Sequence, residues 1–255
     1  MARGGYRPYF AVYSTFLQRA YDQIVHDVCL QNLPVCILSD HVGLVGDDGK
    51  THHGVLSVPM LMSIPNLTLL APRDTRQIRQ AVRATLKLDG PCVVQYPKEG
   101  IEPYAQNVTG EPFAVGKWQT LIPGGQDAVI LAYGRMTQNA IQASELLVQR
   151  GLSVGVIDCC SLKPLDMDCL RALFERKAKI VTIEEGEMIG GFGSEIARVC
   201  VEENADAPVQ IIGLENRFIT HGSVPELLRE CGLTPEQLAD RIEEIAGDKE
   251  SSHVG

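Results

Sequence analysis

The sequence lacks three features that would indicate a membrane protein, a nucleic-acid-binding protein or an exported protein. It contains no apolar run near the roughly 20 residues that a membrane-spanning helix needs. Its 23 Lys and Arg are outnumbered by 32 Asp and Glu, and the net charge of −9 argues against nucleic acid or an anionic membrane as the main partner. The opening residues, MARGGYRP, have no apolar signal core, so we expect a cytoplasmic protein.

Paired cysteines and aromatic residues are also scarce. The eight cysteines form no CxxC motif and most of them lie in apolar runs, so we expect reduced, buried thiols. Aromatic residues make up only 5% of the chain, and the single tryptophan, Trp118, is expected to pack in the interior. Hydrophobic residues at 45% and charged residues at 22% are the balance of an ordinary globular protein.

Strand-like and helix-like segments alternate along the chain, which predicts an α/β fold of two three-layer α/β/α units with mainly parallel sheets. We expect the first unit over residues 1–108, the second over residues 109–247 and a disordered tail over residues 248–255. The segment 98–112 contains glycine and proline without periodicity and is expected to be a linker. The predicted strands are residues 7–13, 35–39, 67–71, 92–96, 113–121, 127–133, 152–157, 179–184 and 208–213. One predicted helix follows residue 13 and another ends near residue 204. The other predicted helices are residues 74–88, 137–150, 166–176, 224–230 and 234–246.

Three polar clusters follow strands of the first predicted unit. They are Tyr13–Arg19, Asp40–Gly54 and Tyr96–Lys98. Ligands of open parallel sheets bind beyond the carboxyl ends of the strands. We therefore expect these three clusters to converge at one edge of one sheet and to form a site.

Single residues of these clusters allow more than one interpretation. Asp48 with His52 suits proton transfer or hydroxyl binding, although a solvated turn with ordinary loop histidines is equally compatible with the spacing. Phe16 beside Tyr13 offers a flat face to a heteroaromatic ring, whereas core packing is the commoner fate of such a residue. Arg19 could bind an anion or be a solvated charge.

Neither a metal site nor a nucleotide loop is predicted. His52 and His53 are adjacent in sequence, and two adjacent histidines rarely bind the same metal ion. No third ligand has the spacing of a metal site. The glycine-rich segment GEMIGGFGS lacks the spacing GxGxxG, so tight packing between helix and strand is the preferred explanation of its glycines.

Six motifs are distributed over nearly the whole chain: YSTFLQRAYDQIVHDV, GLVGDDGKTHHG, IPNLTLLAPRD, KPLD, EEGEMIGGFGS and RFITHGS. They resemble the 1-deoxy-D-xylulose-5-phosphate synthase family, which is thiamine-diphosphate dependent and belongs to the transketolase superfamily. The resemblance implies a transferase that joins pyruvate to glyceraldehyde 3-phosphate with loss of carbon dioxide. Its product feeds the synthesis of isoprenoids (terpenoids), thiamine and pyridoxal.

The resemblance covers the later portion of the family's pyrimidine-binding domain and all of its C-terminal domain. The glutamate that activates the cofactor belongs to a family segment that this sequence does not contain. The same holds for the first domain, whose motif holds the diphosphate and magnesium. An unaided catalyst is therefore not expected. The implied cofactor is thiamine diphosphate, with Mg²⁺ held by the missing domain, and the implied partners are a second copy in a homodimer and a separate N-terminal transketolase-like chain.

The resemblance also implies roles for single residues. Phe16 would stack on the aminopyrimidine ring with Tyr13 beside it. Asp48 and His52 would contact the hydroxyls of donor and acceptor and assist proton transfer. His41 in DHVG and Lys98 in YPKEG stand where the family has phosphate-binding arginines, and neither offers the two-pronged donor of a guanidinium. Arg19 lies in a matching motif and is a further candidate for the substrate phosphate.

Three functional hypotheses therefore stay open. The chain is part of a synthase-like enzyme that needs the missing half, or it is half of a transketolase-type carboligase with a different acceptor, or it is a non-catalytic dimerising or regulatory paralogue. In each case the first unit lacks the start of its sheet, and exposed strand edges favour self-association.

Overall fold

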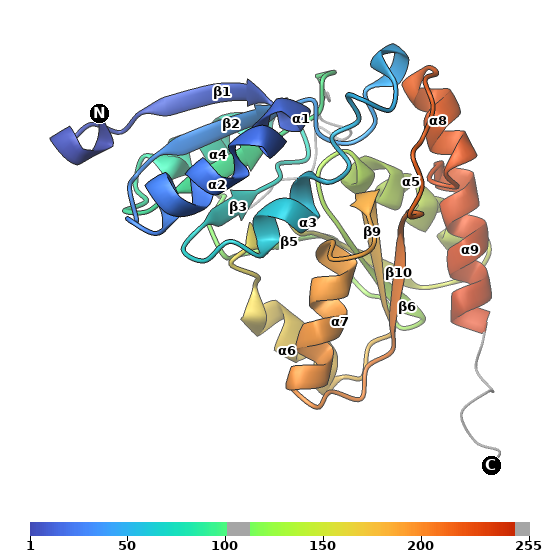
Figure 1. Ribbon diagram of the computed structural model, residues 1–255. Helices are drawn as coiled ribbons and strands as arrows, with labels where there is room; N and C mark the ends of the chain where they lie inside the picture. The colour runs from blue at the N-terminus through green and yellow to red at the C-terminus, as the bar shows by residue number, and fades with distance from the viewer. Residues whose placement is uncertain (101–112, 248–255) are drawn as a thin grey trace.

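We describe the fold from a computed structural model, which covers residues 1–100 and 113–247 of the chain (Figure 1). The predicted boundary between the two units, most of the predicted linker and the predicted tail lie outside these residues. Two five-stranded sheets with helices on their faces confirm the predicted α/β architecture. No helix within the described ranges is long and apolar enough to cross a membrane.

The first sheet has the strand order β1-β2-β4-β3-β8. Its first four strands are parallel, and β8 runs antiparallel to β3. The helical segment after β1 is divided into short α, 3-10 and π turns rather than forming one α-helix. The elements of this part are η1 Ala2–Gly4, β1 Tyr9–Tyr13, α1 Ser14–Leu17, η2 Gln18–Ala20, α2 Tyr21–Gln23, η3 Ile24–Cys29, β2 Cys36–Asp40, η4 Gly46–Asp48, α3 Ser57–Met62, β3 Thr68–Leu70, α4 Thr75–Thr85, β4 Cys92–Gln95 and β8 Ser161–Lys163.

The second sheet has the strand order β10-β9-β6-β7-β5, and only β5 is antiparallel to its neighbour. Alternate residues of β6 point to opposite faces of the sheet, as in any β-strand, and both faces are covered. Its elements are β5 Gln119–Ile122, β6 Ala128–Ala132, α5 Met136–Gln149, β7 Val154–Asp158, α6 Met167–Glu175, β9 Ile180–Glu187, α7 Phe192–Glu202, β10 Val209–Leu214, α8 Val224–Glu230 and α9 Pro235–Gly247.

The largest apolar core lies between the two sheets and joins the two halves of the chain. Val129 and Leu131 of β6 face this core, together with residues of α6 and α7 and of the first sheet. Ile130 of the same strand faces a second core beneath α5, α8 and α9. A third, small core lies between the first sheet and α4. Figure 1 shows the same arrangement, with α8 and α9 on one side of the second sheet and α6 and α7 on the other.

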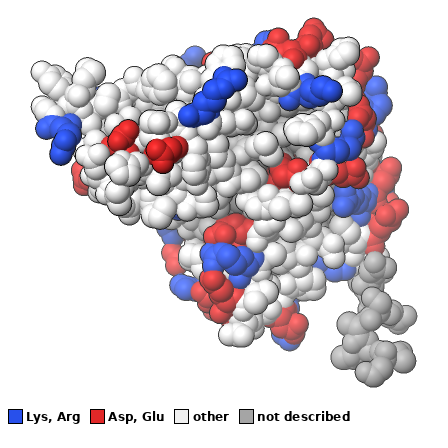
Figure 2. Space-filling view, viewed as in Figure 1, with Lys and Arg blue, Asp and Glu red and all other residues white. Residues whose placement is uncertain are grey.

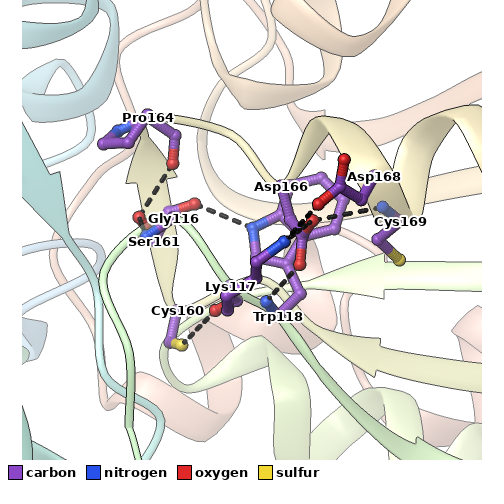
Figure 3. Close-up of polar contacts among 9 residues, drawn as sticks. All are labelled: Gly116, Lys117, Trp118, Cys160, Ser161, Pro164, Asp166, Asp168 and Cys169. Atoms are coloured by element: carbon purple, nitrogen blue, oxygen red, sulfur yellow. Dashed lines mark hydrogen bonds and ion pairs between the residues drawn. The ribbon is translucent and has the colours of Figure 1, made fainter.

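The segment before β5 differs from the prediction, because residues 113–118 do not form a strand. Side-chain hydrogen bonds hold this segment instead, as Figure 3 shows. The Trp118 indole donates to the Ser161 carbonyl at 2.8 Å, and the Trp118 amide donates to the Asp166 carboxylate at 2.9 Å. The Gly116 amide donates to the Ser161 hydroxyl at 2.9 Å. The predicted interior position of Trp118 is confirmed by its exposure of 7%.

A buried ion pair also crosses between the two halves. The Arg73 guanidinium, which precedes α4, contacts the carboxylate of Asp158 at the end of β7. Gln77 donates to the same carboxylate oxygen at 2.6 Å. Asp158 is fully buried, and burial raises its pKa while the charge of Arg73 opposes that rise. The pair therefore holds α4 of the first half against β7 of the second.

The glycine-rich segment between β9 and α7 packs closely on the sheet at Gly193 and is hydrogen-bonded to the Glu184 carboxylate. A Cβ atom on Gly193 would lie 2.4 Å from Thr182 Oγ1 and 2.6 Å from Ile211 Cγ2, so only glycine allows α7 this close to the sheet. The prediction of tight helix–strand packing is thereby confirmed. The Glu184 carboxylate accepts the amides of Phe192 and Gly193, both at 2.9 Å. Buried glutamate thus satisfies the first amides of α7.

The titration of Glu184 is expected to make the stability of the protein depend on pH. Burial raises the pKa of Glu184 to about 7, from 4.5, although the two amides oppose the rise. Between these two pH values the unfolded chain has released the proton that the folded chain keeps, so the free energy of unfolding falls as pH rises, by about 3 kcal/mol in total. Glu184→Gln should remove this slope in thermal unfolding measured at several pH values. Equal slopes in Glu184→Gln and the unchanged protein would contradict the prediction, and Glu175→Gln serves as the control.

Candidate functional site

The loop of residues 40–54 is held in place by both halves of the chain. Two backbone hydrogen bonds join its ends. The Gly43 amide donates to the Gly54 carbonyl at 3.3 Å, and the Gly54 amide donates to the Gly43 carbonyl at 2.8 Å. A Cβ atom on Gly54 would lie 2.3 Å from the His41 carbonyl oxygen and 2.3 Å from Ser14 Oγ, so the strand-to-helix turn after β1 closes directly on the loop. On the other side the loop packs against residues 220–224, which precede and begin α8 (Figure 1).

Two buried side chains fix this loop from within. His53 is 5% exposed and accepts the Val45 amide with Nδ1 at 3.1 Å, so its protonated Nε2 donates to the Thr220 carbonyl at 2.9 Å. Glu185 at the end of β9 accepts the Leu44 amide at 2.9 Å and pairs with Arg135 at 3.2 Å. His53 is therefore a structural residue, and Glu185 is a positioning residue that no motif of the first half could indicate.

The three predicted polar clusters converge at the carboxyl edge of the first sheet, as expected. The rings of Tyr13 and His41 are stacked with centroids 3.8 Å apart, and Phe16 lies 5.1 Å from Tyr13. His52 presents its ring edge-on to Tyr13 at 5.5 Å and to Phe16 at 6.0 Å. The Arg19 guanidinium carbon lies 5.9 Å from the centroid of the Phe16 ring.

Asp48 connects this aromatic group to the third cluster. Its carboxylate accepts the Lys98 ammonium at 3.0 Å and the Tyr13 hydroxyl at 3.3 Å. The hydrogen bond from Lys98 is the main reason why the pKa of Asp48 is lowered, while burial and the charge of Asp48 raise the pKa of Tyr13 to about 12. The structure thus brings together all seven predicted residues, namely Tyr13, Phe16, Arg19, His41, Asp48, His52 and Lys98.

The predicted association of Asp48 with His52 takes an indirect form. Nδ1 of His52 lies 2.8 Å from the Thr51 hydroxyl, and among the described residues Asp48 has no hydrogen bond to His52. The charges of the two residues still interact, since His52 contributes to lowering the pKa of Asp48. His52 therefore remains a half-exposed imidazole beside an ionised carboxylate.

Removing Lys98 is expected to raise the pKa of Asp48. Lys98→Ala takes away both the hydrogen bond and the positive charge that hold this pKa below its usual range. The pKa is measured from the pH dependence of the Asp48 carboxyl signal in NMR spectra. Lys50→Ala, two residues from Asp48, is the matched control, and an equal shift in both variants would show that the pairing with Lys98 is not responsible.

Two family models match most of the chain. The transketolase pyrimidine binding domain matches residues 1–102, and the transketolase C-terminal domain matches residues 116–238. The chain is 40% identical over 247 residues to the 1-deoxy-D-xylulose-5-phosphate synthase of Rippkaea orientalis (strain PCC 8801 / RF-1), covering 96% of this chain and 39% of that protein. It is 42% identical over 252 residues to the synthase of Geobacillus thermodenitrificans (strain NG80-2), covering 98% and 40%. The chain thus spans about two fifths of the length of these relatives.

Solved structures extend the likeness to the fold. A chain described as a split gene transketolase, inactive beta4 tetramer, superposes with a TM-score of 0.87 at 28% identity, covering 98% of this chain and 79% of that chain. A transketolase from Pichia stipitis in complex with sedoheptulose 7-phosphate has a TM-score of 0.75 at 19% identity, covering 94% and 34%. The chain belongs to the transketolase family and carries its pyrimidine-binding and C-terminal domains in that order.

Proposed function

We propose that this chain supplies the pyrimidine-binding and C-terminal part of an enzyme like 1-deoxy-D-xylulose-5-phosphate synthase. Such an enzyme joins pyruvate to glyceraldehyde 3-phosphate with loss of carbon dioxide. The observation that carries the proposal is the convergence of seven aromatic, acidic and basic residues at one sheet edge in a chain about 40% identical to such synthases. The remaining three fifths of the enzyme, supplied by the same or another polypeptide, would hold the diphosphate and magnesium.

The exposed aromatic surface of the site fits the pyrimidine ring of thiamine diphosphate. Phe16 is 47% exposed although its neighbour Leu17 is buried, and Tyr13 and His52 border it. A planar heteroaromatic ring stacks favourably on such a face. The chemistry that this cofactor supplies is stabilisation of a carbanion. The role proposed for Phe16 and Tyr13 is to bind and orient the ring.

The polar residues around this surface are proposed to act on the substrates. The role proposed for His52 is to accept or donate a proton at a substrate hydroxyl, as histidine side chains commonly do in general acid–base catalysis. Asp48, whose pKa is lowered mainly by the hydrogen bond from Lys98, places a carboxylate beside His52. His41, Lys98 and Arg19 are the basic residues proposed to bind a substrate phosphate.

A mixing experiment tests the proposed function. The chain is combined with the complementary part of a related synthase, thiamine diphosphate, Mg²⁺, pyruvate and glyceraldehyde 3-phosphate, and release of carbon dioxide and formation of the sugar phosphate are followed. We expect product only in the complete mixture. If no complementary part gives turnover and the mixture binds no thiamine diphosphate, the proposed function is wrong.

One observation favours a second candidate, a carboligase with another acceptor. Two of the basic residues assigned to the acceptor phosphate lie beside carboxylates: Lys98 pairs with Asp48 at 3.0 Å, and His41 Nδ1 is 3.1 Å from Asp40 Oδ1, where it forms an ion pair only when protonated. A bound phosphate would have to compete with these pairs. Rates in the same mixture with phosphorylated and unphosphorylated aldehydes decide between the two, because a preference for the unphosphorylated acceptor supports the second candidate.

The chain is also proposed to associate with a second copy. β1 lies at the edge of the first sheet, and Tyr9 and Phe10 on it are 38% and 52% exposed. Figure 2 shows few charged side chains over this part of the molecule. An apolar edge strand with unpaired amides and carbonyls favours pairing with another chain. Light scattering after size-exclusion chromatography should give at least twice the mass of 27.9 kDa, and a monomer at all concentrations would refute this.

A further inference from the structure

Two buried cysteines of the first sheet lie side by side on neighbouring strands. Cys36 of β2 and Cys92 of β4 are register partners in a parallel pair, so both side chains point to the same face of the sheet. Neighbouring strands are roughly 4.8 Å apart, within the Cα separation of roughly 4.4–6.8 Å that a disulfide spans. Both thiols are fully buried and free in the small core beneath α4.

Polar side chains lie near this buried pair, namely the Thr85 hydroxyl and the Arg7 guanidinium. Interaction with the Cys92 side chain is the main reason why the pKa of Cys36 is lowered, and interaction with Cys36 is the main reason why that of Cys92 is raised. The Thr85 hydroxyl and the Arg7 guanidinium lower the pKa of Cys36 further, against the effect of burial. Among the described residues, Nη1 of Arg7 has no hydrogen-bond partner. A positive charge thus lies ready to stabilise a thiolate at Cys36.

The remaining cysteines lack this arrangement. Cys159 and Cys160 are adjacent in sequence, but their thiols donate to different carbonyls, those of Ile157 and Lys117. Cys200 donates to the carbonyls of Ala205 and Ala207. Burial raises the pKa of Cys159 and of Cys160 well above the ordinary value. Only the pair in the first sheet combines a register partner with a lowered pKa.

We propose that Cys36 and Cys92 form a redox-active dithiol, which a small peroxide oxidises to a disulfide and a low-molecular-weight thiol reduces again. The Cys36 thiolate attacks one peroxide oxygen, the oxygen–oxygen bond breaks, and hydroxide leaves, so Cys36 becomes a sulfenic acid. The Cys92 sulfur then attacks the Cys36 sulfur, the sulfur–oxygen bond breaks, and the hydroxyl leaves as water with the thiol proton. In total, two thiols and one hydrogen peroxide give one disulfide and two waters.

The edge strand β1 covers the dithiol and provides a route for the oxidant. The Cys36 amide donates to the Pro8 carbonyl at 3.0 Å, and Tyr9 is the register partner of Cys36 on β1. The Tyr9 hydroxyl lies 2.9 Å from the Thr85 hydroxyl, and the Arg7 guanidinium donates to the Leu88 carbonyl. These contacts close the segment over the pair. Within one copy of the chain, and among the residues that the structure describes, β1 pairs only with β2, so local opening of β1 leaves the rest of the sheet paired.

The experiment exposes the folded full chain to hydrogen peroxide, blocks free thiols with an alkylating agent after denaturation, and maps peptides by mass spectrometry. We expect one disulfide-linked peptide pair containing Cys36 and Cys92, which disappears when the reducing thiol is added. Cys36→Ser and Cys92→Ser should each abolish it, while Cys200→Ser should not. If both cysteines are fully alkylated after peroxide treatment, or if they pair only when the chain is denatured before oxidation, the proposal is wrong.

A second measurement does not depend on the folding of cysteine variants. Tyr9→Phe removes the hydrogen bond to Thr85, and one hydrogen bond of about 1 kcal/mol corresponds to about a fivefold increase in the open population and in the rate of disulfide formation. Tyr21→Phe, which removes an exposed hydrogen bond to Ser63 at 3.2 Å, is the matched control. Equal rates in the two variants would overturn the opening of β1 as the route.

Discussion

Replacing His52 by alanine is expected to lower the turnover of the reconstituted enzyme by about 10²–10⁴-fold, the range in which general acid–base catalysis contributes. His52 stands edge-on to Tyr13 and Phe16, on the same side as the surface proposed to hold the cofactor ring. Its imidazole has one nitrogen at the Thr51 hydroxyl, which leaves the other for a substrate. The measurement is the steady-state rate of carbon dioxide release in the complete mixture.

Two controls separate this effect from a change in folding. His26→Ala removes a histidine whose side chain is 70% exposed and lies 3.4 Å from the carboxylate of its neighbour Asp27, away from the proposed site, so it should leave the rate unchanged. The thermal unfolding of His52→Ala should match that of the unchanged chain, because His53 and not His52 holds the loop. A rate in His52→Ala within twofold of the original would remove His52 from the proposed mechanism, whereas the site as a binding surface would stand.

The sheet edge and its polar clusters were predictable because their cause is local. Each cluster directly follows a strand, and parallel strands end at the same edge, so the convergence of Tyr13, His41 and Lys98 needs only the alternation of strands and helices. Helix α8 was expected near Val224–Glu230 and has these bounds in the structure, where Ser223 and Glu226 form a capping box at its start. Local hydrogen-bonding rules of this kind act through neighbouring residues alone.

The remaining features depend on partners distant in sequence. β8 is a three-residue strand that pairs with β3, 91 or more residues away, and no periodicity marks so short a strand. Helix α3 was not predicted, since Pro59 and its neighbours look like a loop until they pack between the two sheets. Glu185 belongs to β9, a buried strand of the second half, yet it holds the loop of the first half. The signals that the sequence offers for Glu185 are an acidic residue in a buried strand and its place in the motif EEGEMIGGFGS.

Arg73→Leu is expected to lower the free energy of unfolding by about 3–5 kcal/mol, which corresponds to roughly 6–20 °C in the midpoint of thermal unfolding. The variant leaves the fully buried carboxylate of Asp158 with Gln77 as its remaining partner. Asp158 lies in β7 and Arg73 precedes α4, so the loss weakens the contact between the two halves of the chain.

The pH dependence of Arg73→Leu identifies the cause of the loss. The Arg73 charge lowers the pKa of Asp158, so its removal leaves the rise due to burial unopposed. A carboxyl whose folded pKa lies above its unfolded value of 3.8 destabilises the folded state as pH rises through that interval. The deficit of the variant should therefore shrink on acidification toward pH 4. Arg73→Leu with Asp158→Leu should recover most of the stability, and Arg171→Leu, at an exposed pair with Glu203, should change little. A deficit that is independent of pH and persists in the double variant would show that lost packing, rather than an unpaired buried charge, destabilises the protein.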